Sequence, residues 1–496
     1  MSPFLDWVLV AVSCASVVLA TPLSTPHVLP QRSAVGFAPL IASEHPHGTV
    51  NNSYIIMLKD DVHPDVKFNH LNFLQTLHQA DPLIGDVSGI QQVYDGHING
   101  YAGRFTEGVL DQLRARPEVA YIEKDQIVRT TEFRTQKSAP WGLARISHRP
   151  KLSFSTFTKY AYDEDGGDGV DVYVVDTGIN IHHVEFGGRA SWGKTVPQND
   201  EDEDGNGHGS HCAGTVASNK YGVSKKANVI AVKVLGSNGS GTMSDVIGGV
   251  AWAATAAAKK DSAAEQEYAA TGKTNHKGSV ANMSLGGGKS QALDDTVNKA
   301  VRSGLHFAVA AGNDNRDACN YSPAAAENAV TVGASTLGDE RAYFSNHGPC
   351  VDVFAPGLNI LSTYKGNPTA VATLSGTSMA SPHVAGLLAY LLSIYPSPSF
   401  DPIFDKEENL ISIESQRLSK SFTLYSLAHS VLPEWVAAFM PSPSLVEAAT
   451  APVPKRPTLT PLQLKKALIA LSSKGLLSDL PDNTVNLLVF NNATSS

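Results

Sequence analysis

The chain of 496 residues is predicted to be an α/β protein, in which a small α+β domain precedes a domain built on a doubly wound parallel sheet. Apolar residues make up 42% of the sequence and glycines number 41, which suits a packed core with many turns and excludes a disordered chain. From residue 139 to 395, short apolar runs alternate with longer helical stretches, as they do in βαβ units. Residues 51–130 carry a separate set of strand and helix patterns.

The predicted strands of the main domain are apolar and rich in valine and alanine. They are Val170–Val175, Asn228–Val234, Ser279–Ser284, His306–Ala310 and Ala329–Val332. One helix is expected from Ser244 to Lys260 with the serine as N-cap, and another from Ala292 to Ser303, ended by Gly304. Open sheets of this kind place their sites just beyond the carboxyl ends of the strands.

The first 20 residues are predicted to be a secretory signal. Trp7–Ala20 is apolar, and small residues precede a plausible cut after Ala20. Asp6 stands where a positive charge is expected, and a membrane anchor is the alternative. Because a span needs about 20 apolar residues and this run is shorter, removal is favoured. Residues 21–50 have no hydrophobic period and are expected to form a leader or linker.

The small domain and the C-terminal region are read in the same way. Within residues 51–130, strands are predicted at Tyr54–Leu58 and Val119–Glu123, and helices at Phe68–His78 and Val109–Arg114.

Residues 396–457 combine Ser, Pro and Glu with scattered apolar pieces and are expected to be a spacer or insertion. The tail, 458–496, should hold a helix from Thr460 to Ser473 that docks on the main domain and a strand at Asn486–Phe490. Part of this tail is a candidate for processing.

Charge and cysteine content restrict the partners and the compartment. The net charge of −9 and the scattered distribution of 38 Lys and Arg residues argue against a nucleic-acid partner. Once Cys14 leaves with the signal, Cys212, Cys319 and Cys350 remain, so one thiol stays free in an oxidising compartment. Glycosylation candidates are Asn51, Asn238 and Asn492, whereas Asn282 lies in a predicted strand and is expected to be inaccessible.

Three short runs in fixed order carry the chemistry: Asp176-Thr177-Gly178, His208-Gly209-Ser210-His211 and Gly376-Thr377-Ser378. Nucleophilic acyl transfer needs a hydroxyl, an imidazole that takes its proton and a carboxylate that orients the imidazole. Ser378, His208 and Asp176 supply these groups. Singly, they are more simply explained as an N-cap before the helical stretch Val384–Leu392, a solvated loop residue and a turn residue. Together they predict a serine protease.

An amide donor for a tetrahedral oxyanion is predicted at Asn313. It follows an apolar strand in the run Ala310-Ala311-Gly312-Asn313. Considered without the other motifs, Asn313 is more simply explained as a turn residue.

Two other classes of function are weighed against a peptidase. An esterase or lipase of the α/β-hydrolase type would carry Gly-x-Ser-x-Gly, but Ala380 stands two residues after Ser378, and the order of the three groups differs. A pseudoprotease that only binds would lack one of the three groups or the amide, and none is missing.

These motifs, with Ser284-Leu285-Gly286-Gly287, resemble the subtilisin superfamily, and His208-Gly209-Ser210-His211-Cys212 resembles its proteinase K branch, most closely the cerevisin-like fungal vacuolar alkaline proteases. Ser210 replaces a threonine usual in that family and keeps the hydroxyl. The resemblance covers residues 139–395. It implies a subtilisin-like fold and an inhibitory propeptide over residues 51–130.

The resemblance also implies further site residues. Gly239, Ser240 and Gly241 would form one wall for an extended substrate, and Ser284, Leu285 and Gly286 the opposite wall. Cys319 and Cys350 would form a disulfide, and Cys212 would be a free thiol near His208, one helical turn away, although it also suits a buried small hydrophobe. Asp352 is aligned with a calcium-binding carboxylate.

The acidic run at residues 200–204 is expected to be a solvated loop and not a calcium site. We expect no cofactor for the chemistry, with calcium as a structural ion at most. The expected partners are protein and peptide substrates and the propeptide itself, with no nucleic acid, no membrane after signal removal and a monomeric state. The location is predicted to be the vacuole or the exterior, and residues 129–137 hold the expected maturation cut.

Overall fold

The computed structural model describes residues 37–41, 49–81, 89–95, 98–126, 133–397, 399–402 and 456–493. The predicted signal, most of the leader, the spacer at 403–455 and the Asn51 side chain lie outside the described residues. The chain divides into two compact units, the first reaching Asp125 and the second running from Gln126 onward, and each is described by itself.

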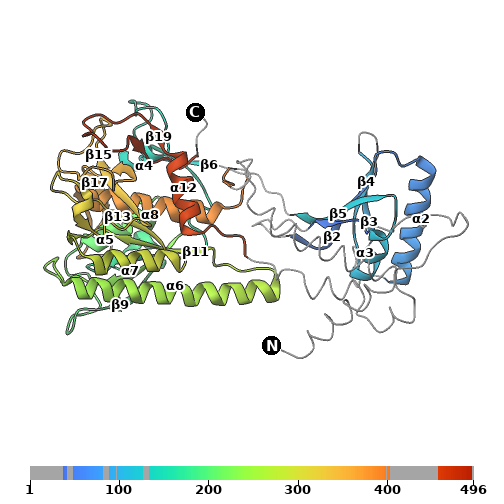
Figure 1. The fold of residues 1–496 in the computed structure, drawn as a ribbon, viewed down its shortest axis with the longest axis horizontal. Helices are drawn as coiled ribbons and strands as arrows, with labels where there is room; N and C mark the ends of the chain where they lie inside the picture. The colour runs from blue at the N-terminus through green and yellow to red at the C-terminus, as the bar shows by residue number, and fades with distance from the viewer. Residues whose placement is uncertain are drawn as a thin grey trace, which may run out of the picture. The chain divides into compact units, whose positions relative to one another are not determined.

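The first unit is a five-stranded sheet in the order β1-β5-β2-β4-β3, with two helices against it (Figure 1). The strands are β1 (Leu40–Ile41), β2 (Thr49–Leu58), β3 (Gly89–Tyr94), β4 (Gly100–Arg104) and β5 (Val119–Gln126), and the helices are α2 (Pro64–Ala80) and α3 (Glu107–Arg114). Ile56, Leu74, Phe105 and Leu113 are fully buried in a core that joins the sheet to both helices. All four predicted elements are present. The sequence analysis missed β1, β3 and β4. β1 has only two residues, and β4 has two glycines and no alternating pattern.

The described residues of the second unit are organised around a nine-stranded sheet in the order β19-β20-β16-β15-β13-β11-β8-β10-β9. All neighbours in this sheet are parallel except the antiparallel pair β19 and β20. The strands are β8 (Val170–Asp176), β9 (Ala190–Thr195), β10 (Asn228–Lys233), β11 (Gly278–Met283), β13 (His306–Ala310), β15 (Val330–Ser335), β16 (Val353–Pro356), β19 (Ser473–Lys474) and β20 (Leu487–Leu488). The predicted doubly wound sheet is confirmed.

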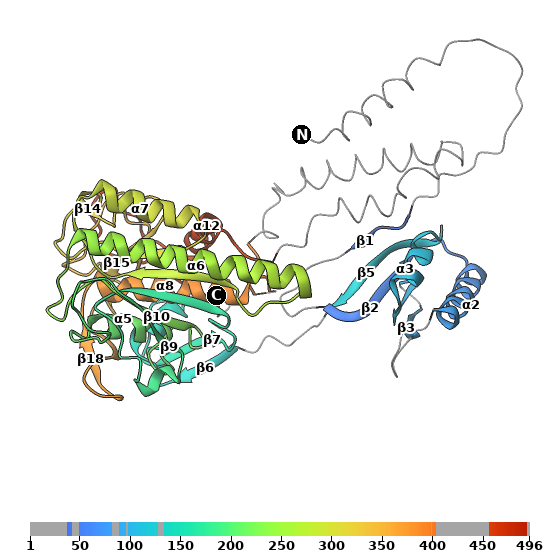
Figure 2. The same cartoon turned by 90° about the horizontal axis from the view of Figure 1, so that it is seen from below.

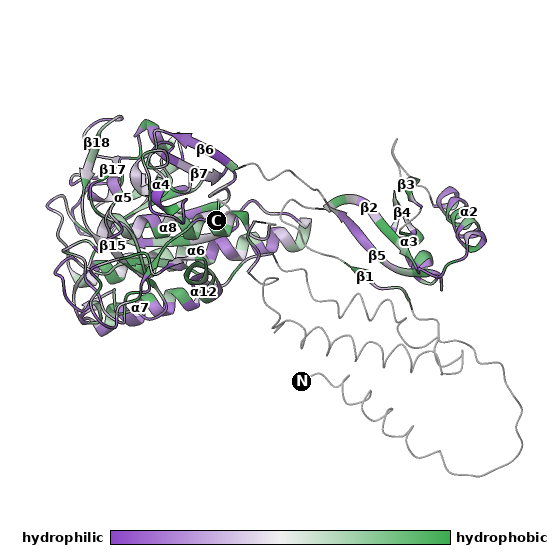
Figure 3. Cartoon of the chain, turned by 90° about the horizontal axis from the view of Figure 1, so that it is seen from above, coloured by the Kyte–Doolittle hydropathy of each residue, from purple (hydrophilic) through white to green (hydrophobic). Residues whose placement is uncertain are grey.

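Helices cover both faces of this sheet. Helices α6 (Met243–Thr271) and α7 (Gln291–Arg302) lie on the side opposite α5 (His208–Ala217), as Figure 2 shows. Helix α8 (Thr377–Ile394) packs with α5 against the centre of the sheet and is strongly hydrophobic (Figure 3). Among the described residues, α8 is the helix apolar and long enough to cross a membrane, but 94% of it is buried, so it is a core helix. Two separate hydrophobic clusters fill the two faces.

Shorter elements complete the second unit. They are the helices α4 (Trp141–Ile146), η2 (Val184–Phe186), η3 (Ala318–Asn320) and α12 (Pro461–Leu471), and the strand pairs β6 (Phe133–Lys137) with β7 (Lys159–Asp163), β12 (Gly287–Gly288) with β14 (Tyr321–Ser322), and β17 (Ile360–Thr363) with β18 (Val371–Leu374).

The start of α6 differs from the prediction. Thr242, not Ser244, is the N-cap, because its Oγ1 accepts from the backbone N–H of Asp245 at 3.1 Å. The helix also continues past Lys260 to Thr271. Its second half carries charged residues that the outer face of a surface helix tolerates.

The tail is part of the second unit's core. Thr460 caps α12 through a capping box, and Leu464 and Leu468 are fully buried in the cluster beneath α8. The expected strand at Asn486–Phe490 is β20, which pairs with β16 and so extends the main sheet. The predicted docking of the tail helix is confirmed.

Candidate active site

Asp176 is the last residue of β8, at the point where the strand order reverses. Strand β10 pairs with one side of β8 and β11 with the other, and all seven residues of β8 are buried. At such a switch point the connections leave in opposite directions and open a crevice beyond the strand's carboxyl end. The prediction that Asp176 lies at the strand end is confirmed.

His208 is the first residue of α5. Its Nδ1 lies 2.8 Å from Oδ1 and 2.9 Å from Oδ2 of Asp176, which itself is fully buried. The preceding residue, Gly207, has a φ of 101° and passes so close to the ring of Tyr364 that a Cβ would meet it at 2.5 Å. Glycine is therefore required there for the helix to begin at the imidazole.

Asp204 corrects the expectation of a solvated acidic loop. It is 8% exposed, and its carboxylate accepts from the N–H of Gly207 at 2.7 Å and from the N–H and hydroxyl of Ser210 at 2.9 and 2.6 Å. It also accepts from the Thr177 hydroxyl at 2.8 Å. The residue thus caps α5 and links it to the end of β8. The sequence signal that could have indicated this capping role is the position of Asp204, four residues before His208.

Two charges act on the imidazole. Burial alone would lower the pKa of His208, but the neighbouring carboxylate of Asp176 and, more weakly, that of Asp204 outweigh it and raise the pKa above the ordinary 6.5. The cation that forms when this imidazole takes a proton is therefore stabilised.

Ser378 lies in the first turn of α8, with Gly376 as N-cap, so the helix begins earlier than the predicted stretch Val384–Leu392. Among the described residues its hydroxyl donates to the carbonyl of Ser284 at 3.0 Å and not to His208. Its own carbonyl accepts from the Ser284 hydroxyl at 2.8 Å. The nucleophile candidate therefore faces the substrate wall, and its hydroxyl must rotate to reach an imidazole.

Asn313 follows β13 and is oriented by Thr377. The side-chain oxygen of Asn313 accepts from the Thr377 N–H at 2.8 Å and from its hydroxyl at 3.0 Å. With the oxygen occupied, the amide nitrogen is the group left to meet a substrate. Thr377 was not singled out from the sequence, although it directly precedes Ser378.

Two hollows adjoin at this site. One, of about 440 Å³, is lined by His208 and by all six predicted wall residues: Gly239, Ser240, Gly241, Ser284, Leu285 and Gly286. The other, of about 400 Å³, is lined by Ser378 and Asn313, and shares Leu285 and Gly286 with the first. The predicted wall residues, His208, Ser378 and Asn313 thus line two adjoining hollows, and the buried Asp176 reaches them only through its bonds to His208. Further lining residues that the sequence analysis missed include Met243, Asp314 and Tyr321.

Cys212 is a buried free thiol one turn along α5 from His208. Its Sγ lies within 4.8 Å of ligand atoms of Asp176 and His208, and it donates to the Ser378 carbonyl at 3.4 Å. Burial, reinforced by the Asp176 charge, raises the pKa of this thiol, so it stays protonated. Both expectations, a buried small side chain and proximity to the imidazole, are confirmed.

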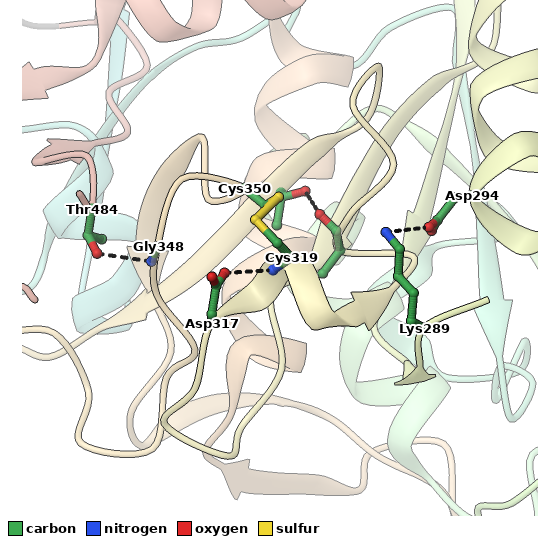
Figure 4. The surroundings of a disulfide bond; sticks show 9 residues. Lys289, Asp294, Asp317, Cys319, Gly348, Cys350 and Thr484 are labelled. Atoms are coloured by element: carbon green, nitrogen blue, oxygen red, sulfur yellow. Dashed lines mark hydrogen bonds and ion pairs between the residues drawn. A yellow bond between two sulfur atoms is a disulfide. The ribbon is translucent and has the colours of Figure 1, made fainter. Parts of the chain in front are cut away.

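The Cys319–Cys350 disulfide is present, with the two Cα atoms 5.3 Å apart (Figure 4). It joins η3 to the segment before β16. Asp317 caps η3 by accepting from the N–H of Cys319 at 2.9 Å, and Thr484 in the tail accepts from the N–H of Gly348 at 2.9 Å (Figure 4).

The surroundings of Asp352 argue against a calcium ion there. The Lys465 ammonium lies 2.8 Å from its carboxylate and also donates to the carbonyls of Glu327 and Ala329 at 2.8 and 2.6 Å. A cationic group of the chain itself therefore already takes these oxygens. Burial raises the pKa of Asp352, and Lys465 opposes the shift.

The glycosylation candidates differ in exposure. Asn238 is exposed in the loop that carries Gly239 and Ser240, whereas the amide of Asn492 is half-buried and donates to the Ser399 carbonyl at 2.8 Å. Asn282 is fully buried and bonded to Ser284 and Ser381, in agreement with its expected inaccessibility.

Comparison with known proteins matches both units. Residues 167–411 match the subtilase family of peptidases, and residues 53–131 match the I9 peptidase inhibitors. The chain is 50% identical over 93% of its length to the subtilisin-like serine protease Pen c 2 of Penicillium citrinum, covering 92% of that protein. It is equally identical over 93% of its length to alkaline protease 2 of Aspergillus fumigatus, covering 85% of it.

Among solved structures, the chain is similar to a cold-adapted subtilisin-like serine proteinase, with a TM-score of 0.52 and 37% identity, over 73% of this chain and 100% of that one. With this identity and coverage, the chain belongs to the subtilase family of serine endopeptidases and carries an inhibitor-type propeptide.

Proposed function

We propose that the protein cuts peptide bonds with Ser378 as nucleophile, His208 as general base and acid, Asp176 as the group that orients the imidazole, and Asn313 as oxyanion donor. The observation that carries this assignment is the His208 ring, held by both carboxylate oxygens of Asp176, beside the cleft that Ser378 and Asn313 line. Asp176 fixes the tautomer in which Nδ1 is protonated, so that Nε2 is free to accept.

In the first half of the reaction the Ser378 hydroxyl passes its proton to Nε2 of His208 as Oγ bonds to the substrate carbonyl carbon. The carbonyl oxygen becomes an oxyanion. When the carbon–nitrogen bond breaks, Nε2 returns the proton to the departing amine and an ester to Ser378 remains. Water then attacks this ester, gives one proton to His208, and Ser378 regains its own as the acid leaves.

The oxyanion is stabilised by two N–H donors, the amide of Asn313 and the backbone N–H of Ser378. The second is free to serve because the first amides of a helix have no intrahelical partner, and the positive end of the α8 dipole adds to it. Besides the substrate and water, only groups of the chain enter these steps, so the proposed chemistry uses no cofactor.

The substrate is bound as an extended strand between the two predicted walls. Main-chain hydrogen bonds to the segments at 239–241 and 284–286 supply affinity without reading side chains, which supports broad specificity. The second hollow, beside Ser378, takes the side chain before the cut. Its lining by Ala310, Ala311 and Ala324 supports a preference for apolar or aromatic residues there.

We infer that the protein is made as a precursor with a signal at residues 1–20, that the first unit acts as its inhibitor, and that maturation cuts within residues 129–137. The match of residues 53–131 to peptidase inhibitors supports the second of these points. The product is a monomeric enzyme of the vacuole or the exterior.

The test is the Ser378→Ala variant, expressed in a host without other secretory proteases. It should accumulate as an uncleaved precursor with no peptidase activity. Both the maturation cut within residues 129–137 and the turnover of substrates need the Ser378 hydroxyl. Intact mass and N-terminal sequencing report the cut, and a fluorophosphonate label on the wild type should modify Ser378 and no other residue.

Ser375→Ala is the matched control. Its hydroxyl is exposed three residues upstream and accepts from the N–H of Asn359, so its loss should leave maturation and activity intact. Normal maturation of Ser378→Ala would refute the assignment.

A further inference from the structure

The loop that carries Asn313 is held on both sides by one buried side chain, that of Asn346. This residue lies between β15 and β16 and has no exposed surface. It belongs to none of the motifs that the sequence analysis singled out, and it lines neither hollow.

On the upstream side, two bonds anchor the loop. The Nδ2 of Asn346 donates to the carbonyl of Ala311 at 2.9 Å, and its backbone N–H donates to the carbonyl of Gly312 at 2.9 Å. On the downstream side, the Oδ1 of Asn346 accepts from the N–H of Asp314 at 3.0 Å and from that of Arg316 at 3.0 Å. Asn313 is the residue between the two anchored pairs.

The backbone is shaped to admit this side chain. Gly312 has a φ of 106°, and a Cβ on it would stand 2.3 Å from Nδ2 of Asn346. A side chain at 312 would therefore displace the asparagine as well as strain the backbone. Gly312 and Asn346 form one packed unit beneath Asn313.

Thr377 and Asn346 divide the task of placing the amide. Thr377 holds the Asn313 side-chain oxygen, which sets the rotation of the amide. Asn346 holds the main chain on both sides of Asn313, which sets the position of the Asn313 Cα from which the side chain extends. Since an oxyanion donor must be aimed at the developing charge, and a misplacement of about 1 Å can cost about 10²-fold in rate, both settings affect turnover.

We propose that Asn346 is a positioning residue for the oxyanion hole, acting through Asn313. This inference rests on the proposed role of Asn313. It predicts that the two residues are coupled in turnover although Asn346 does not touch the substrate.

The experiment is a double-mutant cycle on the matured full chain, with active enzyme counted by titration with a fluorophosphonate. Asn313→Ala should lower kcat by about 10²- to 10³-fold. Asn346→Ala, which keeps its backbone bond to Gly312 and loses the three side-chain bonds, should lower kcat by about 10- to 100-fold with KM little changed. In the Asn313→Ala background, the same change at 346 should have almost no further effect on kcat.

Asn491→Ala is the matched control for structural damage. Asn491 is equally buried, and its side chain donates to the carbonyl of Ala161 at 2.8 Å and accepts from the N–H of Ala493 at 3.1 Å. Its loss should lower the Tm as the Asn346 change does but leave kcat unaltered. If Asn346→Ala yields no mature enzyme, Asn346→Ser, which keeps a hydroxyl under the loop, serves in its place with a smaller loss.

The outcomes separate the two hypotheses. A normal kcat for Asn313→Ala would overturn the oxyanion assignment and this inference with it. A large effect of Asn313→Ala, together with a change at 346 that lowers kcat by the same factor in both backgrounds or not at all, would leave the proposed function intact and overturn the positioning role. An equal loss of kcat in Asn491→Ala would also overturn it.

Discussion

Individual carboxylates favour the protonated form of the His208 imidazole. Asp176 bonds to the ring directly, while Asp204 acts from the N-terminus of α5 through the field of its charge. Both favour the protonated ring, so the neutral ring that the proposed role as general base requires predominates only at pH values above a raised pKa. The same neighbours stabilise the cation formed during the reaction.

The acid limb of the pH profile should therefore lie above pH 6.5 for the free enzyme, which kcat/KM reports. Asp204→Asn removes one of the raising charges and should move the midpoint to lower pH. The measurement is kcat/KM for a peptide amide between pH 5 and 10.

Asp202→Asn is the control from the same acidic run, since this exposed side chain bonds to the Thr195 hydroxyl and not to α5. An identical shift in both variants would point to general surface charge instead of the cap. An unmoved midpoint in Asp204→Asn would contradict the argument.

Elements place the site by their ends. The carboxyl end of β8 supplies Asp176, the first turns of α5 and α8 supply His208 and Ser378, and the segment after β13 supplies Asn313. Helix starts and strand ends carry unpaired backbone groups, which is why polar side chains gather there. Between these elements, the disulfide joins η3, next to the cleft residue Tyr321, to the segment before β16.

Replacing both Cys319 and Cys350 by alanine should lower the free energy of unfolding by about 3 to 4 kcal/mol, because the bridge closes a loop of 31 residues in the unfolded chain. Thermal unfolding of the enzyme blocked with a sulfonyl fluoride avoids self-digestion. Ser375→Ala, already the maturation control, should unfold as the wild type does. An unchanged Tm in the double variant would contradict the prediction.

The whole molecule buries several histidines in neutral form. Burial lowers the pKa of His211, His306 and His383 to about 4 in each case, and all three lie in the second unit. In the unfolded chain these groups bind protons near pH 6.5, so between that value and pH 4 the unfolded state binds more protons than the folded one. Folding stability must therefore fall as the pH falls through this window.

The expected slope reaches about 1.4 kcal/mol per pH unit for each such histidine. Denaturant unfolding of the blocked enzyme at pH 7, 6, 5 and 4 measures it. His306→Gln should reduce the slope, whereas Ser375→Ala, which removes no titratable group, should leave it unchanged. A stability that is flat or rises toward pH 4 would refute this account.

Local sequence patterns were enough to predict the α/β class and six of the nine described strands of the main sheet, with ends within three residues, and to point to the three catalytic candidates and Asn313. Those features are local: hydrophobic period, glycine positions and short polar runs at element ends. The start of α6 was placed two residues late because Thr242 and Ser244 are both good caps, and only the geometry of the first turn selects between them.

Contacts between residues distant in the sequence become visible only in the folded chain. Asn346 acts on a loop more than 30 residues upstream, Lys465 on Asp352, and the Ser284 carbonyl accepts the hydroxyl of Ser378. No local pattern carries these pairings, because a hydrogen bond between segments depends on how the sheet and helices pack. The physical reason is general: propensity and periodicity act over a few residues, whereas the partners of a buried polar group are chosen by the whole fold.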